Sequence, residues 1–149
     1  MVDIIICILR PEDKPEWLRM RHLLWPGHTD AELLAEMDEI LSSPNEQPVF
    51  VAVRSEGGLG GFLEGGMRKY ADGCDSSPVG YIEGWYVDKN LRQKGVGGSL
   101  VQAMEAWARL CDLTDMASDT WLENETSIAA HDRLGYVEVE RLVHFAKKL

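Results

Sequence analysis

A glycine-rich turn at residues 92–98, Arg-Gln-Lys-Gly-Val-Gly-Gly, constrains the fold of this chain more than any other feature. It follows Val79–Val87, which is the strongest strand candidate in the sequence. After the turn, apolar residues recur at helical spacing, at Val96, Leu100, Met104, Trp107 and Leu110. A strand, a tight turn and a long helix in this order indicate an α/β domain.

The rest of the pattern predicts a single domain over residues 1–149, without repeats or an obvious linker. Further strands are expected at 4–9, 49–53, 59–67, 115–118 and 137–146, and further helices at 16–24, 29–41 and 124–134. Thr29 and Glu32 suggest a capping box, and Gly135 is well placed to end the last helix. We expect a mixed, mostly antiparallel central sheet flanked by helices.

The net charge and the cysteine content limit which classes of ligand and partner this chain can bind. The net charge of -10 disfavours nucleic acid and anionic membrane surfaces, since both require a basic face, and it would attract a cationic ligand. No apolar run approaches the roughly 18 residues of a membrane helix. Cys7, Cys74 and Cys111 form no C-x-x-C pair, so we expect reduced thiols in a cytoplasmic protein and no metal site.

The glycine turn is a candidate anion site, because its backbone can approach a ligand closely at the positive end of a helix. Arg92 and Lys94 could contact phosphate oxygens, although a solvated basic turn is the alternative. A P-loop is excluded because Gly98 is followed by Ser99 and Leu100 rather than by Lys and Ser or Thr. A dinucleotide fingerprint fails because Leu100 stands where its third glycine is needed.

Two motifs in this order resemble the GNAT superfamily of N-acetyltransferases. Arg92, Gly95 and Gly97 form the R-x-x-G-x-G pattern of its acetyl-CoA pyrophosphate loop. The later segment from Asn124 through His131 to Leu134, Gly135 and Tyr136 is similar to the N-x(6)-Y-x-x-L-G-F/Y motif of the family. The resemblance implies a GNAT fold and acetyl-CoA as the acetyl donor.

More specific segments resemble the aminoglycoside 6'-N-acetyltransferases of type I, over most of the chain from about Trp25 to Glu140. They are the Trp-Pro-Gly-His at 25–28, the loop at 70–78, Glu83-Gly84 and the segments at 116–120 and 123–124. This likeness implies acetyl transfer to the 6'-amino group of an aminoglycoside or a similar polycationic small molecule, with antibiotic resistance as the outcome. It also implies a homodimer, in which the apolar last strand could pair across the subunit boundary.

The same resemblance assigns the cofactor-binding residues. They are Trp85, Tyr86 and Val87 on the strand, Arg92, Gln93, Lys94, Gly95, Val96, Gly97 and Gly98 in the turn, and Asn124 before the last helix. The main-chain N–H groups of residues 85–87 are the expected donors to the acetyl oxygen. Asn124 could equally be a plain helix cap, and the strand residues could pack in the core while their backbone binds.

Glu83 is the expected group for binding and deprotonating the acceptor amine. Strand alternation predicts that its side chain shares a face with Tyr81, Trp85 and Val87, where a carboxylate needs a partner or a function. A glutamate on the solvated face is the alternative. No cysteine is set up for activation, so direct attack of the amine on the thioester is favoured over an acylated enzyme.

The remaining site residues come from the resemblance. Substrate binding is assigned to Trp25, His28, Tyr70, Glu83, Asp119 and Glu140, although Trp25 could be a core aromatic and each acid could be solvated. His131 departs from the tyrosine usual in the family and is a candidate general acid, with a packed helix residue or solvent as alternatives. An enzyme for another amine, such as a polyamine or a protein N-terminus, and a non-catalytic acyl-CoA-binding module stay open.

Overall fold

The computed structural model describes residues 3–149 and contains one sheet with the strand order β1-β2-β3-β4-β5. The strands are β1 (Ile4–Ile8), β2 (Val49–Arg54), β3 (Leu59–Arg68), β4 (Val79–Val87) and β5 (Met116–Ser118). Neighbouring strands from β1 to β4 are antiparallel, whereas β4 and β5 are parallel. The predicted mixed, mostly antiparallel sheet is therefore confirmed.

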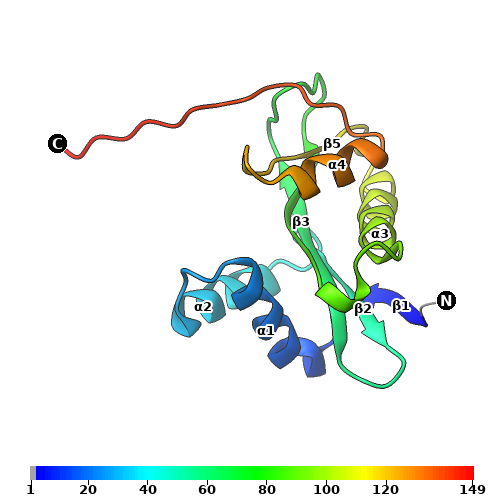
Figure 1. The fold of residues 1–149 in the computed structure, drawn as a ribbon. Coiled ribbons are helices and arrows are strands. Elements are labelled where there is room, and N and C mark those ends of the chain that lie inside the picture. Colours follow the sequence, from blue (N-terminus) through cyan, green and yellow to red (C-terminus); the bar gives the residue numbers. More distant parts are fainter. Residues whose placement is uncertain (1–2) are drawn as a thin grey trace.

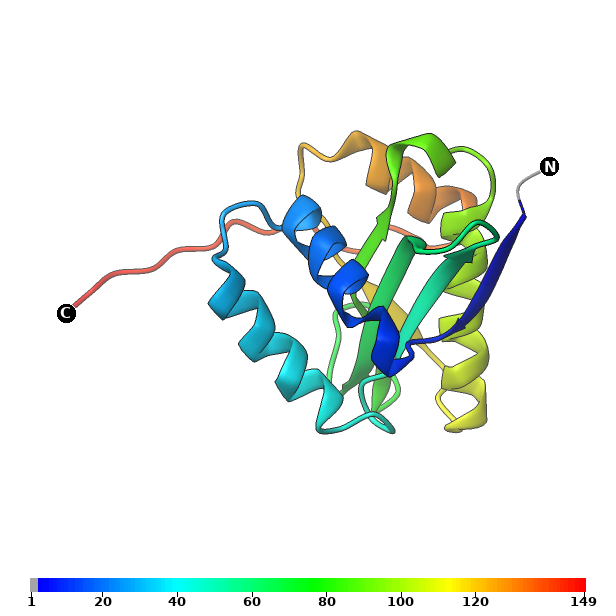
Figure 2. The same ribbon diagram turned by 90° about the horizontal axis from the view of Figure 1, so that it is seen from below.

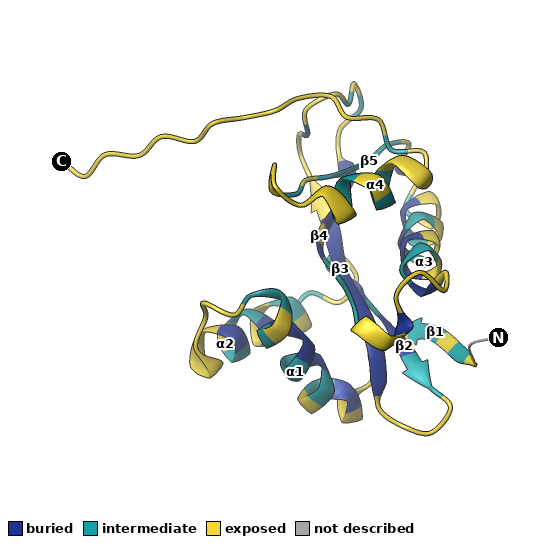
Figure 3. Cartoon of the chain, viewed as in Figure 1, coloured by how far each residue is buried: buried dark blue, intermediate teal, exposed yellow. Residues whose placement is uncertain are grey.

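Helices cover both faces of this sheet (Figures 1 and 2). They are α1 (Lys14–Leu24), α2 (Asp30–Leu41), α3 (Val96–Leu110) and α4 (Glu125–Arg133), with short 3-10 turns η1 (Pro11–Asp13) and η2 (Lys89–Leu91). Trp17, Phe62 and Met37 lie in the core between the sheet and the pair α1 and α2, while Leu63 and Leu100 lie in the core beneath α3. Figure 3 shows the buried residues along these two layers. No helix within residues 3–149 combines the length and apolarity needed to cross a membrane.

Local sequence signals mark the ends of the helices as expected. The Thr29 side chain accepts a hydrogen bond from the Glu32 backbone at 3.2 Å and caps α2. Asn124 caps α4 in the same way through the Ser127 backbone, at 3.1 Å. Gly135 follows α4 with a φ of 89°, a left-handed conformation that glycine adopts without a steric penalty.

A bulge between β3 and β4 makes the predicted side-chain alternation wrong at the centre of the site. Glu64 pairs with Gly84 and Gly65 pairs with Ile82, so Glu83 is an extra residue on β4. The extra residue reverses the order of faces beyond it. Ile82 and Trp85, three positions apart, both pack in the core under α3. Glu83 therefore does not share a face with Trp85 and Val87, because strict alternation ends at the bulge.

The predicted last strand at 137–146 is absent from the structure. The segment 137–149 is exposed and extended, and its C-terminal part runs away from the body of the molecule (Figure 1). A strand needs a neighbour for its N–H and C=O groups, and no other part of residues 3–149 pairs with this segment. The alternating apolar residues of this segment predicted a strand, and the prediction is wrong because the segment finds no sheet partner within residues 3–149.

A buried ion pair ties α1 to β3. The Glu64 carboxylate accepts hydrogen bonds from Arg21 Nε at 2.7 Å, from Arg21 Nη2 at 2.9 Å and from Trp17 Nε1 at 2.8 Å. Glu64 and Arg21 are almost fully buried, and Arg21 also contacts Glu36 at 2.9 Å. Breaking such a pair on one side leaves an uncompensated buried charge.

We expect Glu64→Leu to lower the free energy of unfolding by about 3–5 kcal/mol, because the buried Arg21 loses its bidentate partner and keeps only the half-exposed carboxylate of Glu36. Urea denaturation followed by circular dichroism measures the loss. The double variant Arg21→Met/Glu64→Leu should regain most of it, since no buried charge then remains. A loss below about 1 kcal/mol in the single variant would contradict a stabilising role for the pair.

Candidate active site

Two clefts adjoin α4, and the larger of these lies between the end of β4, the glycine turn and α4, with a volume of about 870 Å³. It is lined by Leu24, Trp85, Tyr86, Val87, Arg92, Gln93, Gly95, Gly97, Gly98, Asn124, Thr126, Ser127, Ala129, Ala130, Arg133 and Leu134. Nine of the eleven residues predicted to bind the cofactor are in this group. The glycine turn and Asn124, which are far apart in the sequence, therefore meet at one cleft.

The first turn of α3 supplies this cleft with backbone donors. Gly95 precedes the helix in a left-handed conformation, with a φ of 84° and no side-chain cap, and the first bond of the helix runs from Ser99 N to Gly95 O. N–H groups ahead of that bond have no partner inside the helix. Because Gly97 and Gly98 line the cleft, these donors and the helix dipole favour an anion there.

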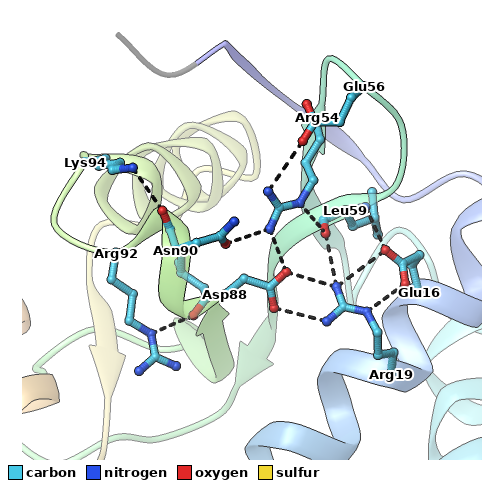
Figure 4. A network of polar contacts seen from close by, with 10 residues as sticks. Glu16, Arg19, Arg54, Glu56, Leu59, Asp88, Asn90, Arg92 and Lys94 are labelled. Carbon is cyan, nitrogen blue, oxygen red and sulfur yellow. Dashed lines mark hydrogen bonds and ion pairs between the residues drawn. The ribbon is translucent and has the colours of Figure 1, made fainter.

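A polar network holds the turn against the rest of the fold (Figure 4). Asp88, the first residue after β4, accepts hydrogen bonds from Arg19 at 3.0 Å and from Arg54 at 2.9 Å. Burial alone would raise the pKa of the Asp88 carboxyl, but the two guanidinium groups outweigh it and hold the pKa below its ordinary value. Arg92 Nε donates to the carbonyl of Val87 at 2.8 Å, which fixes the start of the turn.

Two predicted cofactor-binding residues lie away from the cleft. Lys94 Nζ donates to the carbonyl of Asn90 at 3.0 Å, and the Val96 side chain is buried in the core under α3. Sequence reasoning also missed one face of α4, with Thr126, Ala130 and Arg133. Their spacing of three to four residues after the Asn124 cap was the available signal.

The smaller cleft, of about 410 Å³, is rich in acids and lies between β5, α4 and the start of the C-terminal segment. Its lining contains Asp119, Glu125, Asp132, Glu138 and Glu140, together with Trp121, His131, Tyr136 and a single cation, Arg141. Asp119 and Glu140 are thus brought together as predicted, whereas the exposed Trp121 was not foreseen. Ala129 on α4 lines both clefts, so the two lie side by side.

Glu83 is linked to the smaller cleft through two side chains. Its carboxylate accepts two hydrogen bonds from Arg68, each at 2.7 Å, and the Arg68 guanidinium lies 3.5 Å over the ring of Tyr81. The Tyr81 hydroxyl donates to Asp119. Burial, and then this hydrogen bond, raise the pKa of Tyr81 well above its ordinary value, so that Tyr81 stays a donor.

Trp25, at the end of α1, lies against the backbone next to Glu83. A Cβ built on Gly84 would stand 2.7 Å from the Trp25 ring, so only glycine leaves room for the indole. The ring also stacks on the guanidinium of the buried Arg21, whose Cζ is 4.7 Å from the ring centroid. The Arg21–Glu64 pair therefore helps to orient Trp25 beside Glu83.

Tyr70 and His28 occupy the periphery. Tyr70 is exposed, and its hydroxyl donates to Asp72 at 2.7 Å. His28 Nδ1 lies 3.3 Å from a carboxylate oxygen of Glu32 on α2, so it contacts a helix residue that is not another member of the predicted site. Both remain predictions as substrate-binding residues.

His131 lies on the smaller cleft and not on the larger one. Its Nδ1 donates to the carbonyl of Ser127 at 2.7 Å, so the neutral ring uses Nε2 as acceptor for the Ser118 hydroxyl at 2.8 Å. The ring stands edge-on between Trp85 and Tyr136. Both nitrogens are engaged, and this geometry favours the packed-residue alternative over a general acid.

The two clefts suit ligands of opposite charge. Backbone N–H groups, Arg92 and Arg133 at the larger cleft match a phosphate-bearing ligand, and the acids at the smaller cleft match a cation. Because the clefts share α4, both ligands can be bound at once. Such an arrangement can transfer a group from an anionic donor to a cationic acceptor without an enzyme-bound carrier.

Comparison with characterised proteins gives the same picture. Residues 17–136 match the model of the acetyltransferase (GNAT) family. The chain is 43% identical over 139 residues to an aminoglycoside N(6')-acetyltransferase type 1 from Klebsiella aerogenes, covering 92% of this chain and 91% of the relative. A relative of the same name from Stenotrophomonas maltophilia is 39% identical, with 93% and 90% covered.

Solved structures agree with the fold along the whole chain. AAC(6')-Iy in complex with the bisubstrate analogue CoA-S-monomethyl-acetylneamine superposes with a TM-score of 0.91 at 36% identity, covering 99% of both chains. The aminoglycoside 6'-N-acetyltransferase AAC(6')-Ih from Acinetobacter baumannii gives a TM-score of 0.90 at 34% identity, again with 99% of both chains covered. With its glycine turn at a phosphate-suited cleft and this extent of likeness, the chain belongs to the GNAT family of acetyltransferases.

Proposed function

We propose that this protein transfers the acetyl group of acetyl-CoA to the 6'-amino group of aminoglycosides and thereby confers resistance to them. The acid-lined cleft beside the phosphate-suited cleft is the observation that carries the proposal. The five acidic side chains that line the smaller cleft are complementary in charge to an acceptor with several ammonium groups. The relatives named for this activity, which are 36–43% identical over most of the chain, support the same acceptor.

In the proposed reaction the acceptor nitrogen attacks the thioester carbon, and the bond from that carbon to sulfur breaks. The amine must first lose a proton, and Glu83 is the proposed base, directly or through a water. Backbone N–H groups of residues 85–87 would stabilise the charge that develops on the carbonyl oxygen. Since both His131 nitrogens are engaged, solvent is the proposed proton source for the departing thiolate.

The cysteines support direct attack. Burial raises the pKa of the thiols of Cys7 and Cys74, which lowers their thiolate content. Neither lines either cleft, and the same holds for Cys111. An acylated cysteine is therefore not part of the proposed mechanism. The three free thiols also agree with the cytoplasmic location that we propose.

Purified protein is expected to release CoA thiol from acetyl-CoA with kanamycin or tobramycin, and much more slowly with spermidine or a peptide N-terminus. Glu83→Ala should reduce turnover by about 10²-fold or more, as for a positioned base. Glu39→Ala, which removes an exposed acid on α2, is the matched control and should keep the wild-type rate. Turnover with a peptide but not with aminoglycosides would overturn the proposed acceptor.

A second variant tests the glycine turn. Gly95→Val should raise the Michaelis constant for acetyl-CoA, because valine strains the left-handed backbone that opens the cleft at Gly95. Gly57→Val in the β2–β3 turn is the matched control, since Gly57 also has a positive φ and open space around it but lies elsewhere. Equal effects of both variants on this constant would contradict the assignment.

We also propose a homodimer formed through the C-terminal segment. Val139, Val143 and Phe145 are exposed apolar residues on an unpaired, extended chain, and a second copy would supply the missing strand partner. Light scattering coupled to size exclusion should give twice the mass of the chain. Val143→Asp/Phe145→Asp should give the monomer mass, whereas Leu110→Asp, at an exposed site on α3, should not. A monomeric wild-type protein would contradict the proposal.

A further inference from the structure

The Glu83 carboxylate already forms an ion pair with a side chain of the protein, Arg68. Arg68 Nε and Nη2 donate to the two carboxylate oxygens of Glu83 at 2.7 Å each, the geometry of a bidentate pair. The Arg68 guanidinium also lies over the ring of Tyr81, with Cζ 3.5 Å from the ring centroid. The position that an acceptor ammonium would take on Glu83 is therefore held by Arg68.

The exposure of the Arg68–Glu83 pair allows Arg68 to move away from the carboxylate. The side chains of Arg68 and Glu83 are 44% and 43% exposed, and Arg68 is the last residue of β3. An ion pair in contact with water contributes little to stability. By contrast, the Arg21–Glu64 pair is almost fully buried and cannot open without exposing the core.

We propose that Arg68 is a competing counter-ion, which the acceptor ammonium must displace from Glu83 and which then lowers the pKa of that ammonium. The inference rests on the proposed function, because it takes Glu83 as the site of the acceptor amine. Displaced from Glu83, Arg68 can keep its stacking on Tyr81 and shift toward Asp119, to which the Tyr81 hydroxyl donates.

Two opposite effects follow from this arrangement. Every amine that reaches Glu83 must break the same pair, so Arg68 weakens the binding of all of them by one common factor. Once displaced, the guanidinium stays close to the bound ammonium, and a neighbouring like charge disfavours the protonated form. Arg68 therefore weakens binding while it eases the deprotonation that acetyl transfer requires.

Arg68→Gln tests the first effect by calorimetric titration with kanamycin and with 6-amino-6-deoxyglucose, which carries one amine. Both dissociation constants should fall by the same factor, about three- to tenfold, the worth of an exposed pair plus its stacking. In the Glu83→Gln background the same substitution should give a clearly smaller gain, because no ion pair is left to break and only the repulsion between the guanidinium and the ammonium is removed. Lys14→Gln, which removes one charge from the exposed pair with Asp38, is the matched control and should bind as the wild type does.

Kinetics test the second effect. In Arg68→Gln, KM for kanamycin should fall while kcat also falls at neutral pH, and the acidic limb of the kcat–pH profile should move to higher pH. A merely structural role for Arg68 would lower kcat without tightening the binding of amines. Arg68→Lys, which keeps the charge but loses the bidentate geometry, should lie between the wild type and Arg68→Gln.

The experiments distinguish a failure of the proposed function from a failure of the role proposed for Arg68. A wild-type protein that acetylates no aminoglycoside contradicts the proposed function, and the binding titrations still decide the role of Arg68. Unchanged or weaker amine binding by Arg68→Gln, in a protein with the wild-type circular dichroism spectrum and unfolding midpoint, overturns the role of Arg68. A binding gain that is as large in the Glu83→Gln background as in the wild-type background overturns it as well.

Discussion

The bulge between β3 and β4 is the constraint on which the rest of the site depends. A single extra residue, Glu83, reverses the faces of β4 beyond it, so that Gly84 lies under Trp25 while Trp85 packs toward α3. Without it, the strand would send its side chains to the opposite layers. Glu83, the extra residue, also carries the carboxylate that is proposed to bind the acceptor amine. One bulge therefore sets the faces of β4 and separates the Glu83 carboxylate from the core face of Trp85.

Charge is distributed unevenly around this bulge. On one side of α4, backbone N–H groups of α3 and the side chains of Arg92 and Arg133 line the larger cleft. On the other side, the acids of the smaller cleft outnumber its single cation. A protein with a net charge of -10 thus still provides a local site for an anion, because helix ends and a few guanidinium groups act over short distances.

The guanidinium groups of the chain have different tasks, which follow the burial of the carboxylates that they contact. Arg21 is buried with Glu64 and braces Trp25, while Arg19 and Arg54 converge on Asp88 and hold the glycine turn in place. Arg68 instead stands half exposed on Glu83. The first three pairs join elements of the fold, whereas the last one can open without disturbing any of them.

Sequence alone determined most of the framework and the identity of the cofactor loop. Alternation and helical spacing placed the strands β1 to β5 and the four helices, since these periods record which side faces a core. The spacing of Arg92, Gly95 and Gly97 made the turn a candidate anion site beside the alternative of a solvated basic turn, because the chemistry there belongs to the backbone and to local conformation. The cap residues Thr29 and Asn124 were equally readable, since a cap acts within one turn of helix.

Only the tertiary structure decided what depends on contacts between distant segments. The bulge is set by the pairing of β3 with β4, so the sequence of β4 alone could not reveal that Glu83 leaves the face of Trp85. The pairing of Arg68 with Glu83, the engaged nitrogens of His131 and the burial of Val96 likewise follow from packing. The segment 137–149 shows the same limit. Its alternating apolar residues favour a strand, but a strand forms only where another backbone supplies its hydrogen bonds.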